Sequence, residues 1–434
     1  MPAPLSRYRA ACDSIVALPG STRRGVTVFA KNSDRMPAEE CQPLLQIAAT
    51  DYAPGSTVRC QYIEIDQVAH THAVLLSRPY WLWGGEHGVN EHGLAIGNHT
   101  IFAKDAVADR GLLGMDLVRL ALERSEDAAA AVDLIIELIE RHGQGGSGFV
   151  DSNWPYHNSF LVADARAAWL LEASAGNWAC KEVERTAAGT NHTTIGTDWT
   201  RASAGCRAHA EAEGWLVERD GRLDFAASYR DTSAIPAVVS SGRYRVSTGA
   251  LAAGAGELDV AGFKRIMRDH YAAGDVYVPG APPEDERFFC LCRHDVAGPT
   301  TASMVVELAD PEFSPLLCRV SLCNPCTGVY LPVFPAGRVP VALQSGSRDR
   351  SEDSAWWRFK ALLERVETNY ATLGPRVRDY WQPVEEQLEL QACALRAQLG
   401  PDRSAVAVER MTVFMEEMWC EISERLDDLA TRLE

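Results

Sequence analysis

The period of the apolar residues changes along this chain, and that change constrains the fold more than any other feature. Within the first hundred residues, segments such as CDSIVAL (12–18) and GLAIGNHTI (93–101) show the alternation that predicts β-strands. LLGMDLVRLALER (112–124) then spaces its apolar residues three and four apart, which predicts an amphipathic helix. A second helix follows, with Ser125 as its expected cap, before strands return at 159–173. This order predicts an α+β fold in which sheets are layered between helices.

The composition narrows the class of partner. The 434 residues carry a formal net charge of −17, whereas nucleic-acid binding requires clustered Lys and Arg. No apolar run approaches the length of about eighteen residues that spans a membrane, and MPAPLSRYRAACDS at the start lacks the apolar core of a secretory signal. Twelve cysteines in such a chain predict reduced thiols. We therefore expect a cytoplasmic protein that binds neither nucleic acid nor membrane.

The pattern becomes helical again near the end of the chain. From Trp356 onward the apolar spacing predicts helices, with breaks near Gly374-Pro375 and Gly400-Pro401. We expect residues 12–350 to form the main domain and residues 351–434 to form antiparallel helices packed on it.

Two groups of His and Cys are candidate metal ligands. His70 and His72 lie two apart, but two ligands do not make a zinc site, so packing or exposure is favoured. The motifs FFCLCRHD and SLCNPCTG supply four cysteines: Cys290, Cys292, Cys323 and Cys326. Their spacing fits common structural zinc sites poorly, and the strand-like residues around them favour core packing over zinc.

One glycine-rich stretch gathers aromatic and polar residues. WLWGGEHGVNEHGLAIGNHT contains Trp81, Trp83 and Glu86, and it suits either plain core or a pocket wall with polar groups. Cys12 taken alone is more typical of a buried strand residue than of a nucleophile. The neighbouring motifs change that interpretation.

Several motifs in order resemble the secernins and related dipeptidases, which are cysteine-type N-terminal-nucleophile hydrolases. The similar stretches run from about Cys12 to about Val333 and are CDSIVAL, VFAKNSDR, SRPYWLWGGEHGVNEHGLAIGN, LLGMDLVRLALER, HGQGG, HNSFLVAD, AWLLEA and CNPCTGVYLPVF. The resemblance implies a four-layer αββα sandwich. It also implies that residues 1–11 are a propeptide, whose removal leaves Cys12 at the N-terminus.

The same resemblance implies roles for individual residues. The Cys12 thiolate would attack an amide carbonyl while its own α-amine serves as base, and an α-amine titrates at about 7.7–8.0. Asp34 corresponds to the carboxylate that orients the amine and thiol, and Asn98 to a donor to the oxyanion. Further positions carried over are Asn191 beside the nucleophile, Lys31 where distant acylases have an arginine, and either Arg243 or Arg245.

These roles predict a cysteine-type dipeptidase that acts on small peptide amide bonds. Trp81, Trp83 and Glu86 would line the substrate side, with the Glu86 carboxylate facing the ammonium of a dipeptide. The alternatives are an acylase that hydrolyses N-acyl amides and a non-catalytic, secernin-like regulatory protein. We expect a small peptide or amide as the partner and neither a metal nor an organic cofactor, while homo-oligomers are left open.

Overall fold

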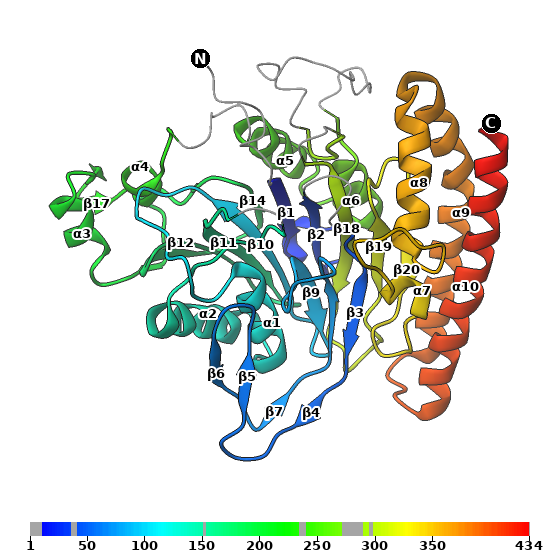
Figure 1. Cartoon of the computed structure of the whole chain (residues 1–434), viewed down its shortest axis with the longest axis horizontal. Coiled ribbons are helices and arrows are strands. Elements are labelled where there is room, and N and C mark those ends of the chain that lie inside the picture. The colour runs from blue at the N-terminus through cyan, green and yellow to red at the C-terminus, as the bar shows by residue number, and fades with distance from the viewer. Residues whose placement is uncertain are drawn as a thin grey trace.

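Two antiparallel sheets face each other in the centre of the molecule (Figure 1). The computed structural model describes residues 11–35, 41–150, 153–233, 240–270, 290–294 and 298–433. In spatial order, the six-stranded sheet contains β14 (Thr186–Gly189), β1 (Ala11–Ala17), β2 (Thr27–Asp34), β18 (Thr300–Leu308), β19 (Cys318–Leu322) and β20 (Leu331–Val333). The eight-stranded sheet contains β15 (Arg201–Ala202), β13 (Asn177–Glu182), β12 (Ala168–Ser174), β11 (His157–Ala163), β10 (Ala95–Ile101), β9 (His87–Asn90), β8 (Val74–Ser77) and β3 (Leu44–Ile47).

Helices cover the outer face of each sheet. α1 (Gly114–Arg124) and α2 (Ala128–His142) pack on the eight-stranded sheet, and α5 (Ser241–Ala253) and α6 (Val260–Met267) pack on the six-stranded sheet. The layers are therefore helix, sheet, sheet and helix, which confirms the predicted αββα arrangement.

The central strand β1 shows why both of its faces are buried. Side chains alternate across a strand, so Val16 points into the core between the sheets, while Ile15 and Ala17 pack with Leu251 and Phe263 beneath α5 and α6. Cys12 lies near the start of this strand and is enclosed from both sides.

The remaining elements are peripheral to the two sheets. Three small two-stranded sheets pair β4 (Thr50–Asp51) with β7 (His70–Thr71), β5 (Thr57–Arg59) with β6 (Glu64–Asp66), and β16 (Glu218–Arg219) with β17 (Arg222–Leu223). The short helices are a 3₁₀ turn (Pro19–Ser21), α3 (Cys206–Ala212), α4 (Phe225–Tyr229) and α7 (Val341–Gln344).

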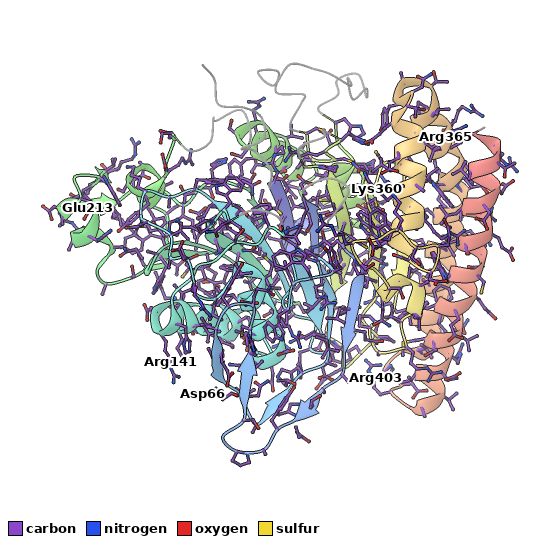
Figure 2. The ribbon with its side chains drawn as sticks, viewed as in Figure 1. Asp66, Arg141, Glu213, Lys360, Arg365 and Arg403 are labelled. Atoms are coloured by element: carbon purple, nitrogen blue, oxygen red, sulfur yellow. The ribbon has the colours of Figure 1, made fainter. Side chains whose placement is uncertain are left out.

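The last part of the chain forms three helices that lie side by side at one end of the molecule (Figure 1). They are α8 (Ala355–Glu367), α9 (Tyr370–Leu399) and α10 (Ala405–Arg432), and they pack against β19 and β20. Figure 2 labels Arg365 of α8, whose Nη2 donates to the carbonyl oxygen of Leu433, 2.7 Å away, just beyond α10. No helix in the described ranges has both the length and the apolar character needed to cross a bilayer.

Two local predictions were wrong. The N-cap of α2 is Asp127, whose side chain accepts a hydrogen bond from Ala130 N, whereas Ser125 ends α1. α9 continues through Gly374-Pro375 because its buried face, which includes Tyr370 and Trp381, outweighs the one backbone hydrogen bond that proline removes. The predicted break at Gly400 is confirmed, since α9 ends at Leu399 and Gly400 has a φ of 50°.

Candidate active site

Cys12 is the second residue of β1, and its side chain points toward the eight-stranded sheet. Its exposed fraction is 3%. The Sγ atom lies 3.6 Å from Glu86 Oε2, and the backbone nitrogen donates to Asn191 Oδ1 at 2.8 Å. The thiol and the backbone nitrogen of one residue therefore have separate polar partners, although those partners lie 74 and 179 positions away in the sequence.

Two cations surround the carboxylate that contacts the thiol. Glu86 Oε1 accepts from Arg35 Nη1, and Glu86 Oε2 lies 3.9 Å from Lys31 Nζ. All three side chains are buried. Glu86 is thus a buried carboxylate that is ion-paired with both Arg35 and Lys31.

The Cys12 thiol is protonated in this arrangement. Burial raises its pKa to about 12, and the negative charges of Glu86 and Asp34 add to this effect, while Lys31 opposes it. A deprotonated sulfur at neutral pH therefore requires a change in its surroundings, such as a nearby base or exposure to solvent.

A buried network fixes Asn191. Its Oδ1 accepts from both Cys12 N and Arg243 Nη2, the latter at 2.7 Å, and its Nδ2 donates to Thr100 O at 2.8 Å. Arg243 is fully buried on α5 and also pairs with Asp13. Arg245, the other candidate from the sequence, is exposed, so Arg243 is the arginine that this fold brings to Cys12.

Asp34 lies at the end of β2, opposite Ala11 in the ladder between β1 and β2. Because paired residues point to one face, its carboxylate is on the opposite face from the Cys12 thiol. Thr300 Oγ1 donates to Asp34 Oδ1 at 2.7 Å. Burial raises the pKa of Asp34 to about 7, against the opposing effects of Arg293 and Arg243.

Asn98 lies on β10, and its amide group has other partners. The Nδ2 atom donates to Asn158 Oδ1 at 3.1 Å and to Ser159 O at 3.2 Å. A Cβ on Gly114, at the start of α1, would lie 2.5 Å from this nitrogen, so glycine is required there. Within the described residues, no hydrogen bond joins Asn98 to Cys12, and its oxyanion role stays a prediction.

Trp81 and Trp83, which the sequence placed together on the substrate side, lie in different surroundings. Trp81 packs against an aromatic and apolar cluster formed by Leu82, Leu113, Met115, Phe149 and Tyr156. This cluster borders the site: the Arg35 guanidinium lies 5.3 Å from the centre of the Phe149 ring, and nearby Glu86 adds to the effect of burial in raising the pKa of Tyr156. Trp83 instead lies under the guanidinium of Arg119, 4.1 Å from its ring, on the α1 side.

Several residues at the site had no role in the sequence interpretation. They are Asp13, Arg35, Tyr156 and Arg293, together with His87, which lies 3.1 Å from Ser33 Oγ across the two sheets. Asp13, Arg35 and His87 lie within the motifs CDSIVAL, VFAKNSDR and SRPYWLWGGEHGVNEHGLAIGN, which was the sequence signal that could have found them. Within the described residues, neither cluster that could hold a metal ion includes Cys12.

Comparisons with known proteins give distant structural neighbours, and no family model matches the chain. A conjugated bile acid hydrolase from Clostridium perfringens has 12% identity and a TM-score of 0.41, over 71% of this chain and 89% of that one. Penicillin V acylase from Agrobacterium tumefaciens has 11% identity and a TM-score of 0.38, over 74% and 86%. The Caenorhabditis elegans ortholog of N-acylethanolamine-hydrolysing acid amidase has 12% identity and a TM-score of 0.35, over 68% and 92%. At such similarity, the function has to be argued from the site.

Proposed function

We propose that this protein is a cysteine amide hydrolase in which removal of residues 1–11 converts Cys12 into an N-terminal nucleophile. The observation that carries the proposal is the double contact of Cys12, whose thiol faces Glu86 at 3.6 Å and whose nitrogen faces Asn191 Oδ1 at 2.8 Å. Residues 1–10 lie outside the described residues, while Ala11 is buried and paired with Asp34.

The proposed chemistry depends on the change from an amide to an amine. The lone pair of a peptide nitrogen is delocalised and does not accept a proton, whereas a free α-amine titrates at about 7.7–8.0. Asn191 Oδ1 would accept one N–H of that amine and so direct its lone pair away from Asn191. The amine takes the thiol proton, the sulfur attacks the amide carbonyl, and the amine then protonates the leaving nitrogen. Water completes the cycle by hydrolysing the thioester.

Within this class we propose a dipeptidase. A free dipeptide carries one ammonium and one carboxylate, and the group formed by Glu86, Lys31 and Arg35 offers both signs of charge in a buried place. Burying either ligand charge without a partner would cost several kcal/mol. The Glu86 carboxylate contacts the Cys12 thiol at 3.6 Å, which supports its assignment to the substrate ammonium.

One observation favours an acylase as the second candidate. The cluster around Phe149 and Tyr156 places apolar surface beside Arg35, and such a surface would accept the uncharged chain of an N-acyl amide. In that case Glu86 would serve only as the ion partner of Arg35 and Lys31.

The first experiment tests maturation and the nucleophile together. Intact-mass analysis and N-terminal sequencing of active protein should find Cys12 as the first residue. Cys12→Ala should retain residues 1–11 and lose hydrolysis, with little change in the thermal unfolding temperature. Cys180→Ala, at another fully buried cysteine on β13, is the matched control and should be processed and active. Active protein that retains residues 1–11 would overturn the N-terminal mechanism.

The second experiment tests the substrate class with processed protein. Free, N-acetylated and C-amidated forms of one dipeptide should be compared by kcat/KM. A dipeptidase should prefer the free form, and Glu86→Gln should narrow the gap between the free and the N-acetylated form. Equal turnover of the free and acetylated forms would favour the acylase, and no turnover by protein that begins at Cys12 would favour a non-catalytic protein.

Asn98→Ala should lower kcat by roughly a hundredfold if Asn98 stabilises the oxyanion.

A further inference from the structure

Four buried side chains converge on one point on the α6 side of the six-stranded sheet. They are His270, Cys292, His294 and Cys326, and their ligand atoms all lie within 4.8 Å of one another. Their exposed fractions range from 0% to 8%. Three separate segments supply them: the chain just after α6, residues 290–294, and the turn between β19 and β20.

Three distances within this cluster come close to those of a tetrahedral zinc site. With Zn–N bonds of about 2.05 Å and Zn–S bonds of about 2.3 Å, tetrahedral angles separate two nitrogens by about 3.3 Å and a nitrogen from a sulfur by about 3.6 Å. The two Nε2 atoms of His270 and His294 are 3.2 Å apart. His294 Nε2 lies 3.0 Å from Cys326 Sγ and 3.8 Å from Cys292 Sγ. One ion therefore fits among these atoms if His294 Nε2 and Cys326 Sγ move apart by about 0.6 Å and the other two distances change by about 0.1–0.2 Å.

Surrounding groups hold the ligands in orientation. Glu367 Oε1 lies 3.2 Å from His294 Nδ1, the arrangement by which a carboxylate fixes the ring of a metal-binding histidine. Tyr370 Oη donates to Cys326 Sγ at 3.3 Å, and Asn324 Nδ2 donates to Cys292 Sγ at 3.7 Å. Hydrogen bonds from donors to the sulfurs stabilise thiolates, which are the form that binds metal.

We propose that His270, Cys292, His294 and Cys326 bind one zinc ion in a structural site. Two thiolates and two imidazoles select zinc over calcium or magnesium, and four protein ligands in a buried place leave no open position for catalysis. The site departs from the sequence expectation, which favoured core packing and grouped these two cysteines with Cys290 and Cys323. Cys290 Sγ instead donates to Cys292 O, and Cys323 Sγ to Trp356 O.

The site would also hold part of the candidate active site, and this consequence rests on the proposed function. Arg293 lies between the ligands Cys292 and His294. Its backbone nitrogen donates to Thr300 Oγ1 at 2.9 Å, and Thr300 Oγ1 donates to Asp34 Oδ1 at 2.7 Å. Residues 290–294 form no helix or strand. Hydrogen bonds from Cys292 N to Asp269 O and from Thr300 N to Arg293 O hold their backbone, and the metal would add a link through two side chains of the segment. Zinc would thereby position the hydrogen-bonded partner of Asp34.

Elemental analysis of the full chain tests the site directly. Protein produced with zinc in the medium should contain about one zinc per chain. Cys292→Ala and Cys326→Ala should each lose it, whereas the matched controls Cys290→Ala and Cys323→Ala, in the same two motifs, should retain it. Zinc retained by both ligand variants, or lost equally from the controls, would overturn the assignment.

A measurement on the unmodified chain covers variants that fail to fold. Cobalt exchanged into the wild-type protein should give the absorption of a tetrahedral ion with thiolate ligands. Mass spectrometry after alkylation should find Cys292 and Cys326 protected until a chelator is added. A disulfide between these two cysteines, or metal-free protein that does not take up cobalt, would overturn the proposal. The zinc content and the removal of residues 1–11 should be measured on the same samples. Protein that is cleaved before Cys12 but binds no zinc would overturn this inference alone and leave the proposed function standing.

Discussion

Asn191 holds the backbone nitrogen of Cys12, and both polar atoms of its side-chain amide have hydrogen-bond partners. Its Nδ2 donates to Thr100 O, so the atom that faces Cys12 is Oδ1, which only accepts hydrogen bonds. Arg243 donates to the same oxygen and is itself paired with Asp13. The amide group therefore serves as a fixed acceptor for the Cys12 nitrogen, and stabilisation of an oxyanion needs another donor.

Asp34 gives the stability of the chain a defined pH dependence. Burial raises its pKa from 3.8 to about 7, so between these values the folded chain holds a proton that the unfolded chain has released. Stability therefore falls as pH rises through this window and levels off above it. Asp116 and Glu172, whose pKa values burial also raises to about 7, act in the same direction.

Asp34→Asn should remove one of these contributions. In the Cys12→Ala background, which keeps the chain intact, urea denaturation at several pH values should give a shallower fall of stability between pH 4 and 7. The difference in slope should approach about 1.4 kcal/mol per pH unit, the value for one proton. Identical slopes for the two proteins would show that Asp34 does not carry the proton.

The sequence could predict which residues lie near Cys12 but not how their side chains are paired. Alternation on β1 and β2 places Lys31 and Cys12 on one face, and the motif order brings Asn191 to the same end of the sheet. The partners of the Asn98 amide depend on β11, and the choice of Arg243 over Arg245 depends on the rotation of α5. Neither is fixed by local spacing.

At the scale of elements, helix caps show how closely two candidates can compete. Ser125 and Asp127 are both good N-cap residues, but Ser125 is occupied in ending α1, and its carbonyl accepts from Asn90 Nδ2. Asp127 is left to cap Ala130 N. The boundary depends on where the preceding helix ends, which a pattern of single residues does not specify.

Replacing the cap gives a direct test of this boundary. Asp127→Ala should lower the free energy of unfolding by about 1 kcal/mol, because it leaves a backbone N–H of the first turn without its acceptor. Ser125→Ala should have a smaller effect, since its structural contacts are made by the backbone. Urea denaturation of both variants measures the two values. A larger loss for Ser125→Ala would assign the cap to Ser125.

At the scale of the whole molecule, the C-terminal helices belong to the main core. Trp356 of α8, Trp381 of α9 and Met415 of α10 lie in the same buried cluster as Val320 and Leu331 of the six-stranded sheet. A partly buried ion pair reinforces the contact: Arg319 of β19 lies 2.6 Å from Glu389 of α9. The helical pattern predicted that residues 351–434 pack on the main domain, but the extent of this shared core depends on contacts between distant segments.

A continuous core predicts cooperative unfolding. Calorimetry of the full chain should show one thermal transition, because α8–α10 cannot separate without exposing the apolar residues of β19 and β20. A chain ending at residue 350 should lose this transition and expose apolar surface to a hydrophobic dye. A separate low-temperature transition in the full chain would show that the helices are an independent unit.

The enclosure of Cys12 has a further consequence for its reactivity in the intact chain. A thiol that is 3% exposed, with a pKa near 12, is both shielded and protonated, so it reacts slowly with electrophiles and oxidants. Exposed Cys420 on α10 would meet such reagents first. Under the proposed mechanism, the uncleaved protein would carry its nucleophile in an unreactive form, and oxidation of sulfur during synthesis would fall on a residue that the proposed chemistry does not use.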